Sequence, residues 1–172
     1  MNEFALLLAA TLNAGTVLAI AGLGLLINER AGVLNLGAEG MMLEAAIAGF
    51  ATSVHTGNDW TAFAAGAGAG ALMAAPFGVL VIWLNTNQYA TGLALSLFGS
   101  GFSAFVGIRY TQEKLAERPK FEIPGLADIP FVGPAFFKHH PMVYLTIALM
   151  LALAWFLYRS RAGLVLRSVG ES

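Results

Sequence analysis

Between Ala31 and Ile108 the sequence contains only three charged residues, Glu39, Glu44 and Asp59, and all three are acidic. The whole chain of 172 residues has 11% charged and 58% hydrophobic residues, whereas ordinary globular proteins have about 25% charged residues. A soluble domain of this size cannot bury so much apolar surface in one core. The lipid bilayer must therefore be the solvent for most of this chain.

The same composition excludes several functional classes. A formal net charge of −1 argues against a nucleic-acid-binding protein, which would present a basic face. The chain has no cysteine, so it has neither a disulfide framework nor a thiolate metal site. It also contains no Gly-Lys pair, so the phosphate-binding loop of an ATPase is missing. Energy for any active transport must therefore come from a partner or from an ion gradient.

Five apolar stretches have roughly the length needed to cross a bilayer, for which a helix requires about 20 residues. They are Phe4–Ile27, Gly32–Val54, Trp60–Leu84, Tyr89–Ile108 and Met142–Tyr158. Their hydrophobicity is continuous rather than alternating, which indicates helices and argues against a membrane β-barrel. The sequence thus predicts an all-α, polytopic helical membrane protein with about five transmembrane helices, forming a single domain over residues 1–172.

The stretch Asn28–Met42 is the most unusual part of the sequence. Three glycines that permit breaks or close backbone approach punctuate it: Gly32, Gly37 and Gly40. If a helix starts at Gly32, Asn35 and Glu39 lie four positions apart on one face. A carboxylate at membrane depth is costly, so Glu39 should face a cavity or a partner, and transporters build such sites from broken helices. We therefore predict a broken or re-entrant segment after the first span, with Asn35 and Glu39 beside a substrate path.

Two other interpretations of the acidic residues stay open. Glu39 and Glu44 can lie near the membrane interface, where water or Arg30 would satisfy them. Alternatively, both carboxylates form the proton relay of an ion-coupled carrier. Transport by such a carrier would survive ATP depletion and collapse with an uncoupler.

Further polar residues could line the same path. Gln88, Thr91 and Ser96 belong to the segment Asn87–Ser96, although threonine and serine in membrane helices more often bond their own backbone. Asn13 is the only strongly polar residue of the first span. We assign Asn13, Gln88 and Thr91 to the substrate path.

The remaining features favour structural roles. The run Gly66–Gly70 contains a small-xxx-small spacing, which lets helices approach closely in lipid. Pro76 should bend the third span because it removes one backbone hydrogen bond. The adjacent His139 and His140 lack a supporting carboxylate, so we predict no metal site.

Four segments in this order resemble a known family. They are Asn28–Met42, Asn87–Ser96, the run from Ile123 to Pro134, and the run from Leu164 to Glu171. Asn28–Met42 is similar to the Glu-Arg-Ala-Gly-Val-x-Asn-x-Gly-x-Glu-Gly-Met block of permease subunits in bacterial ABC importers of branched-chain amino acids, ribose-type sugars and nucleosides. The resemblance covers nearly the whole chain. It is closest to the simple-sugar or purine-nucleoside branch, and to the second of its two paired permeases.

The resemblance implies a transmembrane permease subunit of an ATP-driven ABC importer for nucleosides or simple sugars, not an enzyme. The implied partners are an ABC ATPase subunit, a second and paralogous permease subunit, and an extracytoplasmic substrate-binding lipoprotein. ATP would bind to the ATPase, so no cofactor is expected in this chain. The implied location is the bacterial cell (inner) membrane, with several passes.

The resemblance also implies a topology, which the positive charges alone leave close to a tie. Residues 109–141 would form an extracytoplasmic loop, and residues 159–172 would start a cytoplasmic coupling loop opened by Arg167, Gly170 and Glu171. Family members are longer than this chain, and the helix that docks on the ATPase follows this last run. We therefore expect an N-terminal fragment, one piece of a split subunit, or a non-transporting assembly piece.

Overall fold

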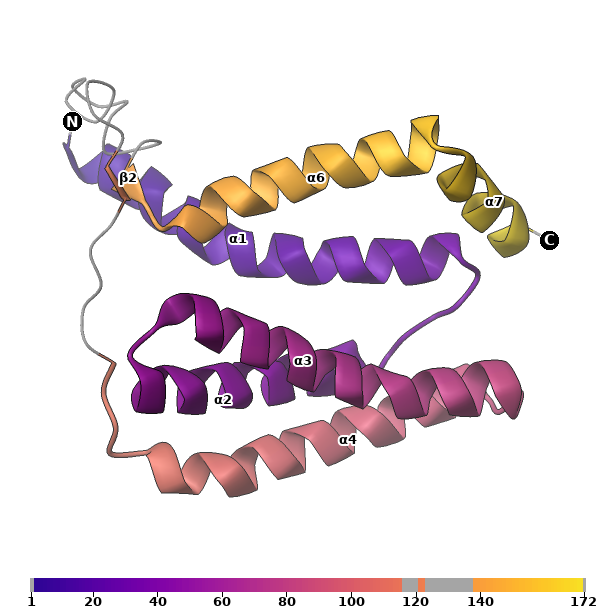
Figure 1. The fold of residues 1–172 in the computed structure, drawn as a ribbon, viewed down its shortest axis with the longest axis horizontal. Coiled ribbons are helices and arrows are strands. Elements are labelled where there is room, and N and C mark those ends of the chain that lie inside the picture. The colour runs from indigo at the N-terminus through magenta and orange to yellow at the C-terminus, as the bar shows by residue number, and fades with distance from the viewer. Residues whose placement is uncertain (1, 116–120, 123–137, 172) are drawn as a thin grey trace. The chain divides into compact units, whose positions relative to one another are not determined.

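The computed structural model describes residues 2–115, 121–122 and 138–171. The chain divides into two compact units (Figure 1). Unit 1 comprises Met1–Gly32 and Glu117–Ser172, and unit 2 comprises Val33–Ala116. The region predicted as a single domain over residues 1–172 therefore contains two such units.

Four helices in the described residues are long and apolar enough to cross a membrane: Glu3–Arg30, Asp59–Trp83, Gln88–Tyr110 and Pro141–Arg159. They correspond to four of the five predicted spans. The predicted span Gly32–Val54 differs because residues 31–37 are not helical, and helix α2 begins only at Ala38. Two glutamates and a histidine in α2 also lower its hydropathy. The chain is an all-α, multi-pass membrane protein, and a break follows its first helix as predicted.

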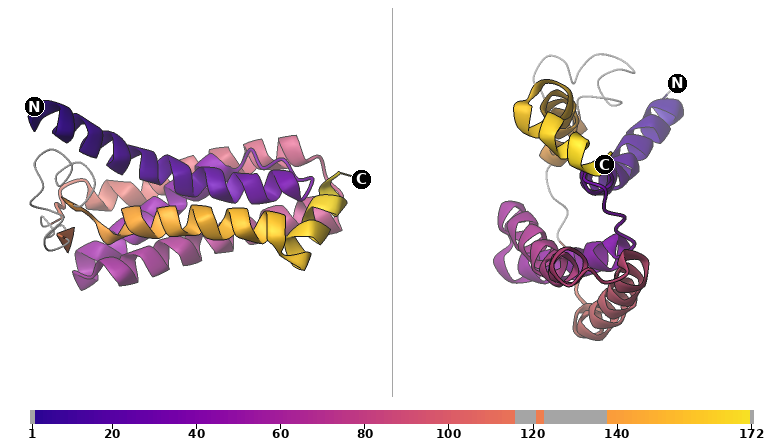
Figure 2. Two further views of the ribbon diagram at one scale, coloured as in Figure 1. Left: turned by 90° about the horizontal axis from the view of Figure 1, so that it is seen from above. Right: turned by 90° about the vertical axis from the view of Figure 1, so that its right-hand side faces the viewer.

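Unit 1 is built on two long helices that lie side by side (Figure 2). Its elements are α1 (Asn2–Arg30), the two-residue antiparallel strands β1 (Phe121–Glu122) and β2 (Lys138–His139), α6 (Pro141–Arg159) and α7 (Arg161–Gly170). The imidazole Nδ1 of His140 accepts a hydrogen bond from the backbone N–H of Met142 and so caps α6. Extended backbone at Ser160 then separates α6 from α7.

Unit 2 contains a helical hairpin and a third long helix. Its elements are α2 (Ala38–Thr56), α3 (Asp59–Gly78), the π-helical turn η1 (Val79–Trp83), α4 (Gln88–Gly107) and the 3₁₀ turn η2 (Ile108–Tyr110). Gly57 ends α2 with a left-handed φ of 65°, a conformation that glycine adopts without strain. The side chain of Asn58 accepts a hydrogen bond from Trp60 N–H and caps α3.

The predicted packing role of the glycine run is confirmed for part of that run. A Cβ atom added at Gly66 would lie 2.9 Å from the carbonyl oxygen of Ala45 in α2, and one at Gly70 would lie 3.6 Å from the Ala45 Cβ. A Cβ added at Gly68 would meet nothing within 4 Å. Only the glycine positions that face α2 therefore need a small residue.

The third span is irregular after Pro76, although α3 continues through the proline. The last turn widens into η1, where Leu84 N–H donates to Val79 O at 3.1 Å. Thr86 N–H then donates to Leu80 O, also at 3.1 Å. These bonds satisfy the backbone where the span ends.

Most of the predicted outer segment 109–141, including the motif from Ile123 to Pro134, lies outside the described residues. At its start, the Tyr110 hydroxyl lies 3.2 Å from His55 Nε2 and so joins the end of α4 to the end of α2.

Candidate functional site

The connection between α1 and α2 forms a compact turn held by Asn35. The Asn35 side-chain oxygen accepts a hydrogen bond from Gly37 N–H at 2.9 Å, and its Nδ2 lies 3.6 Å from Met41 Sδ. A helix does not start at Gly32, because this local bond gives the backbone an alternative to helix and Gly32 has φ 80°. Asn35 therefore does not share a helical face with Glu39.

The same connection is bonded to the start of α4. Leu34 N–H donates to the side-chain oxygen of Gln88 at 3.0 Å. Gln88 is the first residue of α4, so the break lies level with one end of that helix rather than with its middle. The half-buried Gln88 thus has a specific backbone partner in the segment that also carries Asn35.

Close backbone contacts fix the connection and the start of α2 on α4. A Cβ added at Gly92 would lie 2.9 Å from Leu36 N and 3.0 Å from Gly37 N. One turn further along α2, a Cβ at Gly40 would lie 2.7 Å from the Cα of Ser96. Glycine is therefore required on both surfaces, because any side chain would separate them.

Thr91 lies one turn after Gln88 and joins the two ends of the α3–α4 connection. Its hydroxyl is 2.9 Å from the hydroxyl of Thr86, which also donates to Leu80 O at 2.9 Å. We call Asn35, Thr86, Gln88 and Thr91 the polar cluster. It includes three of the predicted path residues, and all of its side chains are neutral. The one bond between two of these side chains that the described residues show is Thr86–Thr91, while Gln88 bonds the backbone of Leu34, next to Asn35.

The two acidic residues of α2 do not belong to the polar cluster. Glu39 is exposed in the first turn of α2, where a carboxylate is favoured by the helix dipole. Glu44 is half-buried. Five positions separate them, which is a rotation of about 140° around the helix. Within the described residues neither forms an ion pair, and the two carboxylates do not share a face.

The fifth predicted path residue, Asn13, belongs to unit 1. Its side-chain oxygen lies 3.2 Å from Nδ1 of His139, whose side chain is only 1% exposed. This bond joins α1 to the residue pair that precedes α6. Asn13 therefore has a structural partner that the sequence pattern did not reveal, and the described residues contain no group of three possible metal ligands around His139.

The residues assigned to the coupling loop form a helix that sequence reasoning missed. Ser160 Oγ accepts a hydrogen bond from Gly163 N–H at 3.0 Å and caps α7. The guanidinium of Arg167 lies 5.0 Å from the centre of the Tyr158 ring. Glu171 N–H donates to Arg167 O at 3.1 Å and ends the helix. A serine cap before Arg161 was the available signal.

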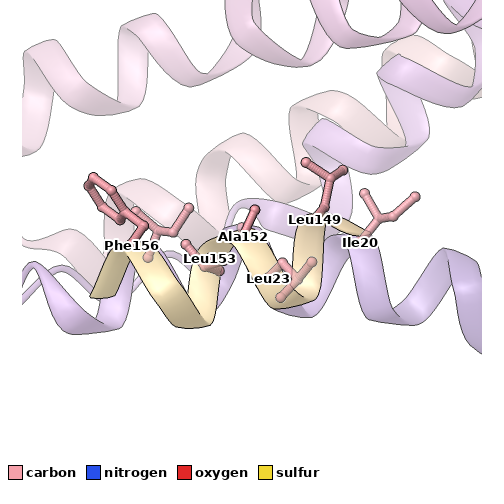
Figure 3. A pocket seen from close by; sticks show the side chains of 8 residues that line it. Ile20, Leu23, Leu149, Ala152, Leu153 and Phe156 are labelled. Atoms are coloured by element: carbon pink, nitrogen blue, oxygen red, sulfur yellow. The ribbon is translucent and has the colours of Figure 1, made fainter. Parts of the chain in front are cut away.

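A groove of about 370 Å³ lies between α1 and α6 in unit 1 (Figure 3). Its lining residues are all apolar: Ile20, Leu23, Gly24, Ile27, Leu149, Ala152, Leu153 and Phe156. A polar ligand needs several convergent hydrogen-bonding groups, and this groove offers none. The polar cluster of unit 2 is therefore the better candidate for contact with a polar substrate.

Comparisons with known proteins agree with this architecture. Residues 7–172 match the family described as the permease component of branched-chain amino acid transport systems. A putative glucose ABC transporter permease protein of Haloferax volcanii is 44% identical, over 99% of this chain and 53% of its own length. A guanosine ABC transporter permease protein of Bacillus subtilis is 33% identical, over 96% of this chain and 56% of its own length.

A nucleoside ABC transporter permease protein of Lactococcus lactis is 27% identical over the full length of this chain and 58% of its own. The chain thus spans about half the length of these relatives. No solved structure matches it. Since the match to the family extends over nearly the entire sequence, the chain belongs to the family of permease components of branched-chain amino acid transport systems.

Proposed function

We propose that this chain supplies the first half of a permease subunit in an ATP-driven ABC importer for nucleosides or simple sugars. The observation that carries the proposal is the set of relatives, whose names specify ABC transporter permeases for glucose, guanosine and nucleosides. The four candidate spans fit a subunit that forms part of a path through the membrane.

The chemistry of the polar cluster supports a neutral substrate. Amide and hydroxyl side chains can exchange hydrogen bonds with the hydroxyl groups of a sugar or of a ribose ring. An amino acid also carries a carboxylate, which arginine or lysine would recognise most strongly. Since no lysine or arginine occurs between Ala31 and Ile108, unit 2 has few positive charges to offer such a substrate.

The proposed assembly supplies what this chain lacks. An ABC ATPase subunit would bind and hydrolyse ATP, a second and paralogous permease would complete the path, and an extracytoplasmic binding lipoprotein would deliver the substrate. The complex would lie in the bacterial cell membrane, and this chain would catalyse no bond chemistry. ATP hydrolysis would drive transport by stabilising one of two helix arrangements more than the other.

The test is uptake by the complete transporter in proteoliposomes. Labelled glucose, guanosine or leucine is offered together with the binding protein, with ATP inside or outside. We expect uptake of glucose or guanosine that requires ATP on the ATPase side and is unaffected by an uncoupler. Uptake that continues without ATP and stops with an uncoupler would instead support an ion-coupled carrier using Glu39 and Glu44, and assembly without uptake would support a purely structural piece.

A matched pair of variants tests the polar cluster. Thr91→Val removes the hydroxyl that bonds to Thr86 and should reduce uptake. Thr61→Val removes a hydroxyl 3.0 Å from that of Thr56 at the α2–α3 turn, a pair with the same spacing outside the cluster. Equal effects of the two substitutions on uptake would contradict a role for the cluster in the path.

A further inference from the structure

The last residue of α7 rests directly on the end of α1. A Cβ atom added at Gly170 would meet the carbonyl oxygen of Arg30 and would lie 2.8 Å from Gly32 N. Conversely, a Cβ added at Gly32 would lie 3.2 Å from the Cα of Gly170. Gly32 also has a left-handed φ of 80°, which side chains disfavour. We call this backbone contact the glycine clasp.

The other end of α7 is fixed to α6 in the same way. A Cβ added at Gly163 would meet the carbonyl oxygen of Phe156 and would lie 2.8 Å from the Cα of Leu157. The Arg167 guanidinium covers the Tyr158 ring. Helix α7 therefore extends from the end of α6 to the end of α1 (Figure 2). Any movement of α7 must carry these two helix ends with it or break close contacts.

The glycine clasp is also close in sequence to the polar cluster. Gly32 is followed by only four residues, 33–36, before Gly37, whose backbone is packed on Gly92 of α4. A chain segment can extend by at most about 3.6 Å per residue. This short segment contains Leu34 and Asn35. Because so few residues separate Gly32 from Gly37, a displacement of Gly32 would also displace Leu34 and Asn35.

We propose that Gly32 and Gly170 are positioning residues for transport: the glycine clasp stays closed throughout the cycle and passes the movement of α7 to the segment that carries Leu34 and Asn35. The inference rests on the proposed function, in which the residues after Arg159 face the ATPase. It gives Gly170 a role inside the subunit rather than a contact with that partner.

The first experiment weakens the clasp in the complete transporter. Gly170→Ala should lower the amount of substrate taken up per ATP hydrolysed by about 2- to 30-fold, the range for residues that carry coupling between sites. Gly22→Ala in α1 is the control, because a Cβ there would meet nothing within 4 Å. An unchanged ratio of uptake to hydrolysis in Gly170→Ala would overturn the proposal.

The second experiment locks the clasp without adding bulk at the glycines. Residues 1–172 contain no cysteine, so Ala31→Cys and Val169→Cys introduce the only thiols of this part of the subunit. Each is next to a clasp residue, and their Cα atoms lie within about 12 Å because neighbouring Cα atoms are ~3.8 Å apart. Cross-linking with a short bifunctional thiol reagent should leave ATP-driven uptake unchanged. Loss of uptake after cross-linking would show that the clasp must open and would overturn the proposal.

The two experiments together distinguish a failure of the clasp proposal from a failure of the proposed function. Gly170→Ala in the double-cysteine chain should reduce cross-linking yield and coupling together, and reduced yield with normal coupling would again overturn the proposal. If Gly170→Ala does not assemble, the cross-linked chain with its natural glycines still decides the question. Absence of ATP-driven uptake in the unmodified transporter would instead refute the proposed function, and the clasp proposal with it.

Discussion

The contact between α2 and α4 makes Gly99 the position where one methyl group should do the most damage. A Cβ at Gly99 would lie 2.5 Å from the carbonyl oxygen and 2.7 Å from the Cα of Gly40. Gly101 lies two positions further along α4, and a Cβ there would meet nothing within 4 Å. Gly99→Ala and Gly101→Ala are therefore the same chemical change on opposite sides of one helix.

The expected magnitudes follow from these distances. An ordinary Cβ contact measures 3.4–4 Å, so Gly99→Ala forces the two backbones apart by roughly 1 Å, and a gap of that size forfeits a quarter to a half of each dispersion contact. Such overpacking typically costs about 1–3 kcal/mol. Gly101→Ala should instead stabilise α4 by about 0.5–1 kcal/mol, because alanine restricts the unfolded backbone and favours helix.

The assay is thermal unfolding of the purified subunit in detergent, followed by tryptophan fluorescence. With a shift of about 2–4 °C per kcal/mol, Gly99→Ala should lower Tm by about 2–12 °C, and Gly101→Ala should leave it unchanged or raise it slightly. Equal melting temperatures for the two variants would refute the close packing of Gly40 on Gly99.

Three further predictions concern single side chains. Gln88→Leu should destabilise unit 2 by about 1–3 kcal/mol in the same assay, because Leu34 N–H loses its acceptor, whereas Gln88→Glu should keep most of that stability. Ser160→Ala should cost about 1 kcal/mol through loss of the α7 cap, and Ser160→Asp should restore it. In intact cells, an impermeant thiol reagent should label Thr111→Cys but label Ala162→Cys only after permeabilisation, and the reverse pattern would invert the topology.

Hydrophobicity was sufficient to predict the long helices, because a helix that crosses lipid needs only length and few charges. It was less informative at residues 32–54, where a fifth span was predicted and helix α2 covers only Ala38–Thr56. There Asn35 forms a turn with Gly37 N–H and stops the helix from starting before Ala38. The pattern of apolar residues does not reveal such a local bond, although an asparagine side chain commonly accepts a hydrogen bond from the backbone two residues further on and so forms a turn.

The sequence predicted which residues belong to the candidate site but not which residues they form hydrogen bonds with. Asn35, Gln88 and Thr91 were selected because polar residues are costly among apolar ones, and the structure places Gln88 in a hydrogen bond with the backbone next to Asn35. Their bonds to Met41, Leu34 and Thr86 depend on the folded path of the chain and could not be inferred from spacing. Asn13 was selected by the same argument, yet its partner is His139, more than a hundred residues away.

The first residues of the α1–α2 connection, before the backbone contacts of Leu36 and Gly37 with Gly92, should open more easily than the start of α2. Leu34 is held on α4 by one hydrogen bond to Gln88, which contributes about 0.5–1.5 kcal/mol. Gly40, by contrast, is held by contacts along the backbone of α4, and Met41 N–H donates to Gly37 O at 3.1 Å within α2. A change between two transport states should therefore break the Leu34–Gln88 bond before it separates α2 from α4.

Hydrogen–deuterium exchange measured by mass spectrometry can test this order of opening, since local opening governs the exchange of bonded amides. In the resting transporter, peptides that cover residues 31–37 should exchange earlier than peptides that cover residues 41–50. Addition of substrate and ATP should change exchange in the first segment and leave the second nearly constant. Equal protection of residues 31–37 and 41–50 from exchange would mean that the connection moves together with α2. In that case Leu34 and Asn35 would not be displaced relative to α4.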